Sequence, residues 1–112
     1  MVQYSTALDA TFLAVADPTR RGILERLGKG ATSITDLAQS FEMTLTGARK
    51  HVAVLERAGM VTTEKIGRVR TCRLGSNRLD SAASWIAIYQ QMLDERLDHL
   101  EKFLKRTTNH SR

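Results

Sequence analysis

The residues best suited to chemistry in this chain are its cations, and they are not evenly spread. Between Thr44 and Arg73 seven cations stand against two anions, whereas the rest of the 112-residue chain carries ten of each. The whole formal excess of +5 therefore falls in one window. Such a concentration is the pattern expected of a surface that faces a polyanion such as nucleic acid. The alternative is an ordinary basic face turned to solvent.

Other chemical constellations are missing from the sequence. It contains no glycine-rich phosphate loop, no Gly-x-Ser-x-Gly and no paired cysteines or histidines at metal-binding spacing. The three histidines, His51, His99 and His110, fall in three different segments. We also expect so small a fold to leave little room for a pocket of about 300 Å³. The sequence therefore predicts no enzyme, no cofactor and no metal site.

Composition places the chain among ordinary folded proteins. Hydrophobic residues make up 42% and charged residues 26%, which argues against wholesale disorder. The length suits one domain, expected over residues 1–106, with a polar, frayed tail over 107–112. No apolar run approaches the ~20 residues of a membrane span. The single cysteine, Cys72, excludes an internal disulfide and favours a reducing cytoplasm.

The elements that must position the cations follow from periodicity and capping. Apolar spacing predicts helices over 6–15, over 18–27, over a short segment holding Leu37, Ala38 and Phe41, and over 45–58. Asp17, Thr35 and Thr44 are the predicted N-caps of the last three. Two β-branched runs, 60–66 and 69–74, flank Gly67-Arg68 and predict a β-hairpin with a basic tip.

The last element is long and amphipathic. Residues 78–105 contain no Gly or Pro, and apolar side chains recur every three or four residues. A helix of that length spans about 42 Å, more than the diameter of so small a domain. We infer that its stripe packs against a second subunit; the alternative is a helix folded back over a loose core. The first predicted helix, 6–15, contributes to the same interface. The predicted dimer interface comprises Leu8, Phe12, Trp85, Ile86, Tyr89, Leu93, Leu97 and Leu100.

In order, these elements predict a mainly α fold with a small β-hairpin, a winged helix-turn-helix with a long C-terminal dimerisation helix. Segments 16–24, 35–38, 50–61 and 67–68 resemble the ArsR (arsenic-repressor-like) family of bacterial winged-helix transcriptional regulators. Segments 85–89 and 95–100 are similar to a branch in which the metal sites of the family are commonly missing. The resemblance implies a homodimer that binds two-fold symmetric operator DNA and represses transcription.

The resemblance also places the DNA-binding residues. The recognition helix begins near Thr44, the wing follows it, and Arg49 is the expected base reader. His51 either fixes the helix by a hydrogen bond or touches phosphate, and Gly47 reflects either close approach to DNA or neutral drift. The full predicted set is Thr44, Thr46, Gly47, Arg49, Lys50, His51, Lys65, Arg68 and Arg70.

The sequence departs from the metal-sensing members of the family. Their Cys-x-Cys pair is replaced by the segment 34–38, which has no thiol. Acidic side chains and His99 on the last helix alternate with cations, so a salt-bridged surface is a simpler interpretation than a metal site. A redox role for Cys72, with Arg70 and Arg73 lowering its pKa, competes with a role as a small buried hydrophobe. The sequence does not determine whether a small molecule or a protein acts as an effector.

The rival function is a winged-helix module that dimerises or binds a protein partner without reading DNA. The concentration of charge at the recognition helix and wing favours the DNA-binding regulator instead.

Overall fold

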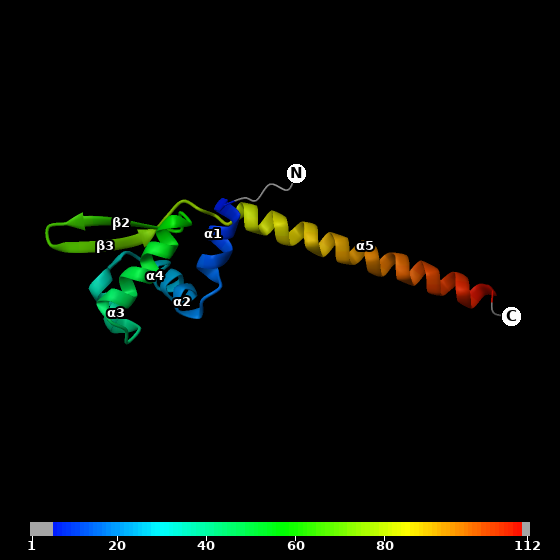
Figure 1. The fold of residues 1–112 in the computed structure, drawn as a ribbon, viewed down its shortest axis with the longest axis horizontal. Helices are drawn as coiled ribbons and strands as arrows, with labels where there is room; N and C mark the ends of the chain where they lie inside the picture. Colours follow the sequence, from blue (N-terminus) through cyan, green and yellow to red (C-terminus); the bar gives the residue numbers. More distant parts are fainter. Residues whose placement is uncertain (1–5, 111–112) are drawn as a thin grey trace. The chain divides into compact units, whose positions relative to one another are not determined.

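The structure is a computed structural model that describes residues 6–110, and it confirms the predicted winged helix-turn-helix (Figure 1). The chain forms two compact units, one ending at Leu79 and one beginning at Asp80. The helices are α1 (Thr6–Val15), α2 (Pro18–Leu27), α3 (Ile34–Ser40), α4 (Leu45–Arg57) and α5 (Asp80–His110). The strands are β1 (Thr32–Ser33), β2 (Val61–Ile66) and β3 (Val69–Leu74).

Two of the three predicted caps are confirmed. The Asp17 side chain accepts a hydrogen bond from the backbone N–H of Arg20 at 3.0 Å, so α2 begins at Pro18. The Thr44 hydroxyl accepts one from the N–H of Gly47, also at 3.0 Å, and α4 begins one residue later. Each cap satisfies a backbone donor that the first turn of a helix leaves without a partner.

The prediction of Thr35 as the cap of α3 is wrong. The cap is Ser33, whose hydroxyl accepts the N–H of Asp36 at 3.0 Å. Ser33 is also paired with Thr71 in the sheet, so the chain stays extended up to Ser33 and turns helical at once. The two-residue strand that decides this, β1, was not predicted, because it is too short to show any periodicity.

The sheet has three antiparallel strands in the order β1-β3-β2. The predicted hairpin is present, with β2 beginning at Val61 and with a turn at Gly67, whose φ of +64° suits glycine. Cys72 stands opposite Thr63 on one side and Thr32 on the other. Since β3 is the central strand, Cys72 becomes the most enclosed position of the sheet.

The core of the first unit is a cluster of small and medium apolar side chains from its four helices, from strands β2 and β3 and from the turn before β2. Its members are Ala14, Ile23, Leu27, Ile34, Leu37, Ala38, Ala48, Val52, Leu55, Ala58, Met60, Val61 and Cys72. Burial raises the pKa of the Cys72 thiol, Glu56 raises it further, and Arg70 opposes them. Arg70 does lower this pKa, but burial and Glu56 outweigh it, so of the two alternatives for Cys72 the structure supports the buried hydrophobe.

Helix α1 turns Thr11 and Ala14 into the core. Leu8 and Phe12, predicted for the dimer interface, are half-buried. Thr11 is acceptable inside because its hydroxyl donates to the carbonyl of Ala7 at 3.0 Å and accepts from the side chain of Asn77 at 3.1 Å.

The side chain of Asn77 holds the segment that follows the sheet in place by hydrogen bonds. Its amide nitrogen also donates to the carbonyl of Ala58 at 2.6 Å, and its side-chain oxygen accepts the N–H of Leu79 at 2.7 Å. Leu79 has a φ of +64°, a left-handed conformation that a leucine adopts only when its surroundings impose it. The side chain of Asn77 thus ties α1, the end of α4 and Leu79 together.

Helix α5 begins at Asp80, two residues later than predicted, and continues to His110, five residues beyond the predicted end. Ser111 and Arg112, the end of the predicted tail, lie outside the described residues, and the domain boundaries stay a prediction. The predicted salt-bridged surface is present: Lys102 binds Asp98 and Lys105 binds Glu101, each at 3.3 Å. Within residues 6–110, no helix has both the length and the hydropathy that crossing a membrane requires.

We predict that Asn77→Ala lowers the free energy of unfolding of the chain by about 2 kcal/mol. The substitution removes three hydrogen bonds and leaves a buried threonine hydroxyl and the Ala58 carbonyl without this donor. Thermal and urea unfolding followed by circular dichroism measures the loss. The exposed neighbour Ser76→Ala is the matched control and stays within about 0.5 kcal/mol of wild type. Equal stability of the two variants would contradict this role for Asn77.

Candidate nucleic-acid interface

Helix α4 has one face in the core and the opposite face in solvent. Ala48, Val52 and Leu55 are at most 1% exposed. Arg49, Lys50, Thr46 and Arg57 are exposed. At about 100° per residue Lys50, Thr46 and Arg57 stand opposite the buried set, and Arg49 lies on the flank between the two faces. The second helix of the helix-turn-helix, α3 followed by α4, therefore presents a cationic outer face.

The first turn of α4 combines a cap with a glycine. Thr44 Oγ1 accepts the Gly47 N–H, and a Cβ placed on Gly47 would lie only 3.2 Å from that same hydroxyl. A glycine at this position therefore leaves room for the capping hydroxyl, a reason that the sequence did not reveal. Leu45, the first residue of this helix, is 38% exposed, unlike the apolar positions Ala48, Val52 and Leu55 further along it.

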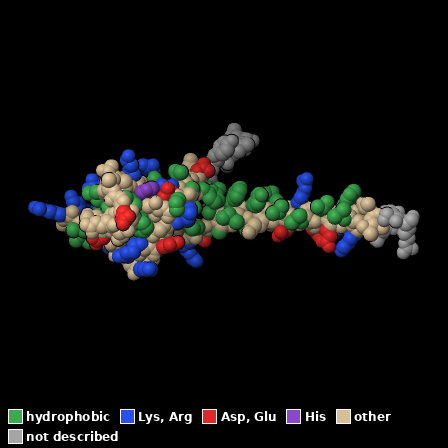
Figure 2. Space-filling model, turned by 90° about the horizontal axis from the view of Figure 1, so that it is seen from below, with side chains coloured by type: hydrophobic (Ala, Val, Ile, Leu, Met, Phe, Trp, Pro, Cys, Tyr) green, Lys and Arg blue, Asp and Glu red, His purple; other side chains and the backbone are tan. Residues whose placement is uncertain are grey.

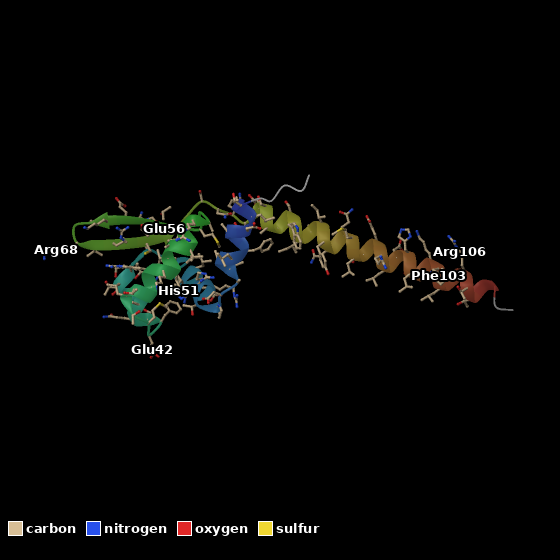
Figure 3. The ribbon with its side chains drawn as sticks, viewed as in Figure 1. Glu42, His51, Glu56, Arg68, Phe103 and Arg106 are labelled. Carbon is tan, nitrogen blue, oxygen red and sulfur yellow. The ribbon has the colours of Figure 1, made fainter. Side chains whose placement is uncertain are left out.

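The β2–β3 hairpin forms the wing, and its cations are exposed. Figure 3 shows Arg68 at the tip of the hairpin, where it follows the Gly67 turn. Lys65 and Arg70 stand opposite each other in the register of the two strands. All three side chains are exposed, as a surface that meets phosphates requires.

A hydrogen-bonded chain joins α4 to the wing. The Thr63 hydroxyl, on β2, donates to Glu56 Oε2 at 3.2 Å, and Arg70 Nη1, on β3, donates to Thr63 Oγ1 at 3.1 Å. Glu56 and Thr63 were not among the predicted site residues. Only the folded arrangement brings Glu56 and Thr63, seven positions apart, onto one wall, so no sequence motif marks them.

This wall closes one side of a recess of about 410 Å³. The recess is lined by Ile34, Arg49, Val52, Glu56 and Arg70. A second recess of about 370 Å³ lies beside the end of β3 and is lined by residues of α2, the sheet and the following segment. The expectation that the fold leaves little room for a pocket is therefore wrong. The first recess brings together Arg49 and Arg70, two cations predicted independently from the recognition helix and the wing.

His51 lies on the flank of α4 away from Arg49, because the two positions are about 200° apart around the helix. Its Nδ1 is 3.2 Å from Arg20 Nη1 and 4.0 Å from Asp17 Oδ2. The predicted hydrogen bond that fixes the helix is thus present, through Nδ1. Arg20, which holds His51, was not among the predicted site residues.

Asp17 is the acidic partner in this cluster. The pKa of its carboxyl is lowered, chiefly by the hydrogen bond from the backbone N–H of Arg20; desolvation, the next largest effect, raises it, and the positive charge of Arg20 lowers it further. The carboxylate is therefore the stable form beside α4 at neutral pH.

Metal chemistry finds no support among the residues that the structure describes. Within that part of the chain, no three His, Cys, Asp or Glu side chains form a group that could hold a metal ion.

Exposed apolar side chains run along α5, as Figure 2 shows. Among them, Trp85 stacks on Tyr89 with ring centroids 5.9 Å apart.

Three comparisons with known proteins agree with this geometry. A family model described as a helix-turn-helix domain matches residues 15–64, which span α2 to β2. The crystal structure of an ArsR family transcriptional regulator is 39% identical to this chain, with a TM-score of 0.73, and the match covers 84% of this chain and 97% of that one.

Two curated relatives are also regulators. The HTH-type transcriptional regulator Rv2034 of Mycobacterium tuberculosis is 30% identical over 98 residues, which cover 80% of this chain and 92% of that protein. The transcriptional repressor SdpR of Bacillus subtilis is 27% identical over 79 residues, 70% of this chain and 88% of that protein. None of these names describes an enzyme. With its fold, its cationic α4 and wing, and these relatives, the chain belongs to the ArsR family of winged helix-turn-helix transcriptional regulators.

Proposed function

We propose that this DNA-binding regulator is a homodimeric repressor that binds an inverted-repeat operator. One observation carries the proposal: α4 buries one face in the core and exposes cations away from it, next to a wing that exposes Lys65, Arg68 and Arg70 toward its tip. A helix with this arrangement suits the major groove, and the wing suits the adjacent phosphates or minor groove.

In this proposal the exposed side chains divide into readers and positioners. Arg49 reads a guanine edge, since arginine forms bidentate hydrogen bonds there, and Lys50 meets phosphate. Thr46 and the backbone near Thr44 and Gly47 approach the groove at the start of α4. Arg68 enters the minor groove or meets phosphate at the wing tip. The remaining positioning charges are Lys65 and Arg70.

Dimerisation rests on the exposed stripe of α5. Large apolar side chains on this helix are between 44% and 63% exposed, an area that a monomer rarely leaves to water. A second copy of the chain covers it in the proposed dimer, which then holds two α4 helices about one DNA turn apart. The α5 side chains proposed for the interface are Trp85, Ile86, Tyr89, Leu93, Leu97 and Leu100; Leu8 and Phe12 of α1 complete it.

Repression is supported by the relative SdpR, which is named a transcriptional repressor. The proposed place of action is the cytoplasm, where the DNA of the bacteria that carry the two named relatives lies. The means of release from DNA is left open between a small molecule, a partner protein and no effector at all.

The decisive experiment is the capture of sheared genomic DNA from the encoding organism by the purified chain at about 150 mM salt, followed by sequencing. Enrichment of a few loci that share an inverted repeat is the expected result. Uniform weak recovery would contradict the proposed function and favour the protein-interaction module.

We predict that the double substitution Arg49→Ala with Arg68→Ala weakens operator binding by about tenfold or more, because it removes a base reader and a wing contact. The slope of log affinity against log salt concentration becomes shallower by about 1 to 2. Fluorescence anisotropy with a labelled operator measures both quantities.

The matched control for this double variant is Arg96→Ala with Lys102→Ala, which makes the same change in net charge on α5. The control keeps operator affinity within about twofold of wild type. If both double variants lose affinity equally, net charge alone governs binding and the assignment of Arg49 and Arg68 fails.

We also predict that Thr63→Val lowers operator affinity about fivefold, the equivalent of one hydrogen bond. Valine suits a β-strand but breaks the chain from Glu56 to Arg70, so the wing loses its fixed position against α4. Thr62→Val, at the exposed neighbouring position, is the control and binds like wild type. Equal affinities of the two variants would show that the hydrogen bonds from Glu56 through Thr63 to Arg70 do not position the wing.

For the dimer, we predict that Leu97→Lys shifts the chain to monomer by placing a charge in the apolar stripe of α5. Sedimentation equilibrium at micromolar concentration measures the shift. Gln91→Lys introduces the same side chain at a polar position outside the apolar stripe, about 120° from Leu97 around the helix, and leaves the dimer intact. A dimeric Leu97→Lys variant would exclude this part of the stripe from the interface.

A further inference from the structure

The guanidinium of Arg20 is held at three points. Its Nε donates to the carbonyl of Ala14 at 2.9 Å, and its Nη2 donates to the carbonyl of Leu13 at 2.7 Å. Its Nη1 lies 3.2 Å from His51 Nδ1. Because two carbonyls at the end of α1 fix the plane of the guanidinium, the position of Nη1 against the imidazole is fixed as well.

This contact determines the protonation of the imidazole. Arginine keeps its charge and has no acceptor, so Arg20 Nη1 donates and His51 Nδ1 accepts with its lone pair. A neutral imidazole whose Nδ1 accepts carries its proton on Nε2. Asp17 Oδ2 does not reverse the assignment, because it lies 4.0 Å from Nδ1 and already accepts the backbone N–H of Arg20 at 3.0 Å.

The accessibility of the second ring nitrogen, Nε2, follows from the hydrogen bonds around the ring. Among the side chains that the structure describes, no buried nitrogen or oxygen lacks a hydrogen-bond partner. The hydrogen bond of the His51 ring runs through Nδ1, so Nε2 reaches solvent, in agreement with the 27% exposure of the side chain. His51 follows Lys50 on α4, at the edge of the face that carries the proposed DNA contacts.

We propose that Arg20 holds His51 in the Nε2–H form and that this outward N–H donates a hydrogen bond to a phosphate oxygen of the DNA backbone. Arg20 is then a positioning residue, and the two ring nitrogens have separate tasks: Nδ1 binds α4 to the end of α1 through Arg20, and Nε2 binds DNA. This inference rests on the proposed function for its second half only. The first half, the protonation of the ring, is a property of the free protein.

The contact has an electrostatic signature of its own. A neutral imidazole donates to phosphate without neutralising its charge, so it releases no counterion. Loss of the contact therefore lowers affinity without changing the salt slope, whereas loss of Lys50 makes the slope shallower by about 0.9. A hydrogen bond to a charged acceptor corresponds to about a tenfold change in affinity.

Two substitutions at position 51 separate the two nitrogens. The amide of glutamine places an N–H donor near the position of Nε2, and the amide of asparagine places an acceptor near that of Nδ1. His51→Asn keeps the melting temperature near that of wild type and loses about tenfold in operator affinity at an unchanged salt slope. His51→Gln keeps operator affinity within about threefold and melts at a lower temperature. The opposite pattern, or equal losses of affinity in both variants, would overturn the DNA contact.

The protonation state is tested without DNA. Long-range proton–nitrogen correlation spectra of ¹⁵N-histidine-labelled protein at pH 7.5 report which ring nitrogen carries the proton, and the His51→Asn spectrum identifies the signals of His51. We expect the Nε2–H form in wild type and a mixture of the two neutral forms in Arg20→Ala. The control, Arg21→Ala, removes a neighbouring arginine that bonds the carbonyl of Val15 and leaves the wild-type spectrum of His51.

The outcomes distinguish this inference from the proposed function. An Nδ1–H or doubly protonated ring in wild type would overturn the inference, whatever the protein binds. Failure of the wild type to select any DNA sequence would overturn the proposed function and leave the spectroscopic result standing.

Discussion

Helix α4 has to complete a core and meet solvent within 13 residues, and the rest of the first unit is arranged around that requirement. Ala48, Val52 and Leu55 are spaced by four and three, so they close the cluster between the other helices and the sheet. The small alanine lets neighbouring elements come close. If this face were not buried, the cations on the outer face would have no fixed position from which to meet a DNA groove.

Each flank of α4 is joined to a neighbouring element by hydrogen bonds that involve a charged side chain. On one side Glu56 is joined through Thr63 to Arg70 of the wing, and on the other Arg20 holds His51. Both contacts are partly exposed, so they contribute less to stability than the buried face does. What they supply is orientation. A helix held only by apolar contacts retains freedom to rotate, and two directional contacts on opposite flanks oppose that rotation.

The second unit follows a different physical rule. Helix α5 has 31 residues, and its apolar side chains form a continuous exposed stripe rather than the interior of a domain. Its opposite face carries ion pairs one turn apart, which suit water. A helix of this kind gains its stability from a partner surface. In the proposed dimer a second copy of the chain supplies that surface.

The sequence by itself determined the features that depend on local spacing. The helices, the caps at Asp17 and Thr44, the hairpin around Gly67 and the family follow from residues close together in the chain, where periodicity and capping act. Tertiary structure decided the rest: the cap at Ser33, the burial of Thr11, the exposure of Leu45, and the partners of His51 and Glu56. These depend on contacts between segments far apart in the chain or on which face each element turns inward. Sequence spacing limits which residues share a face, but the packing of the other elements selects the face that is buried.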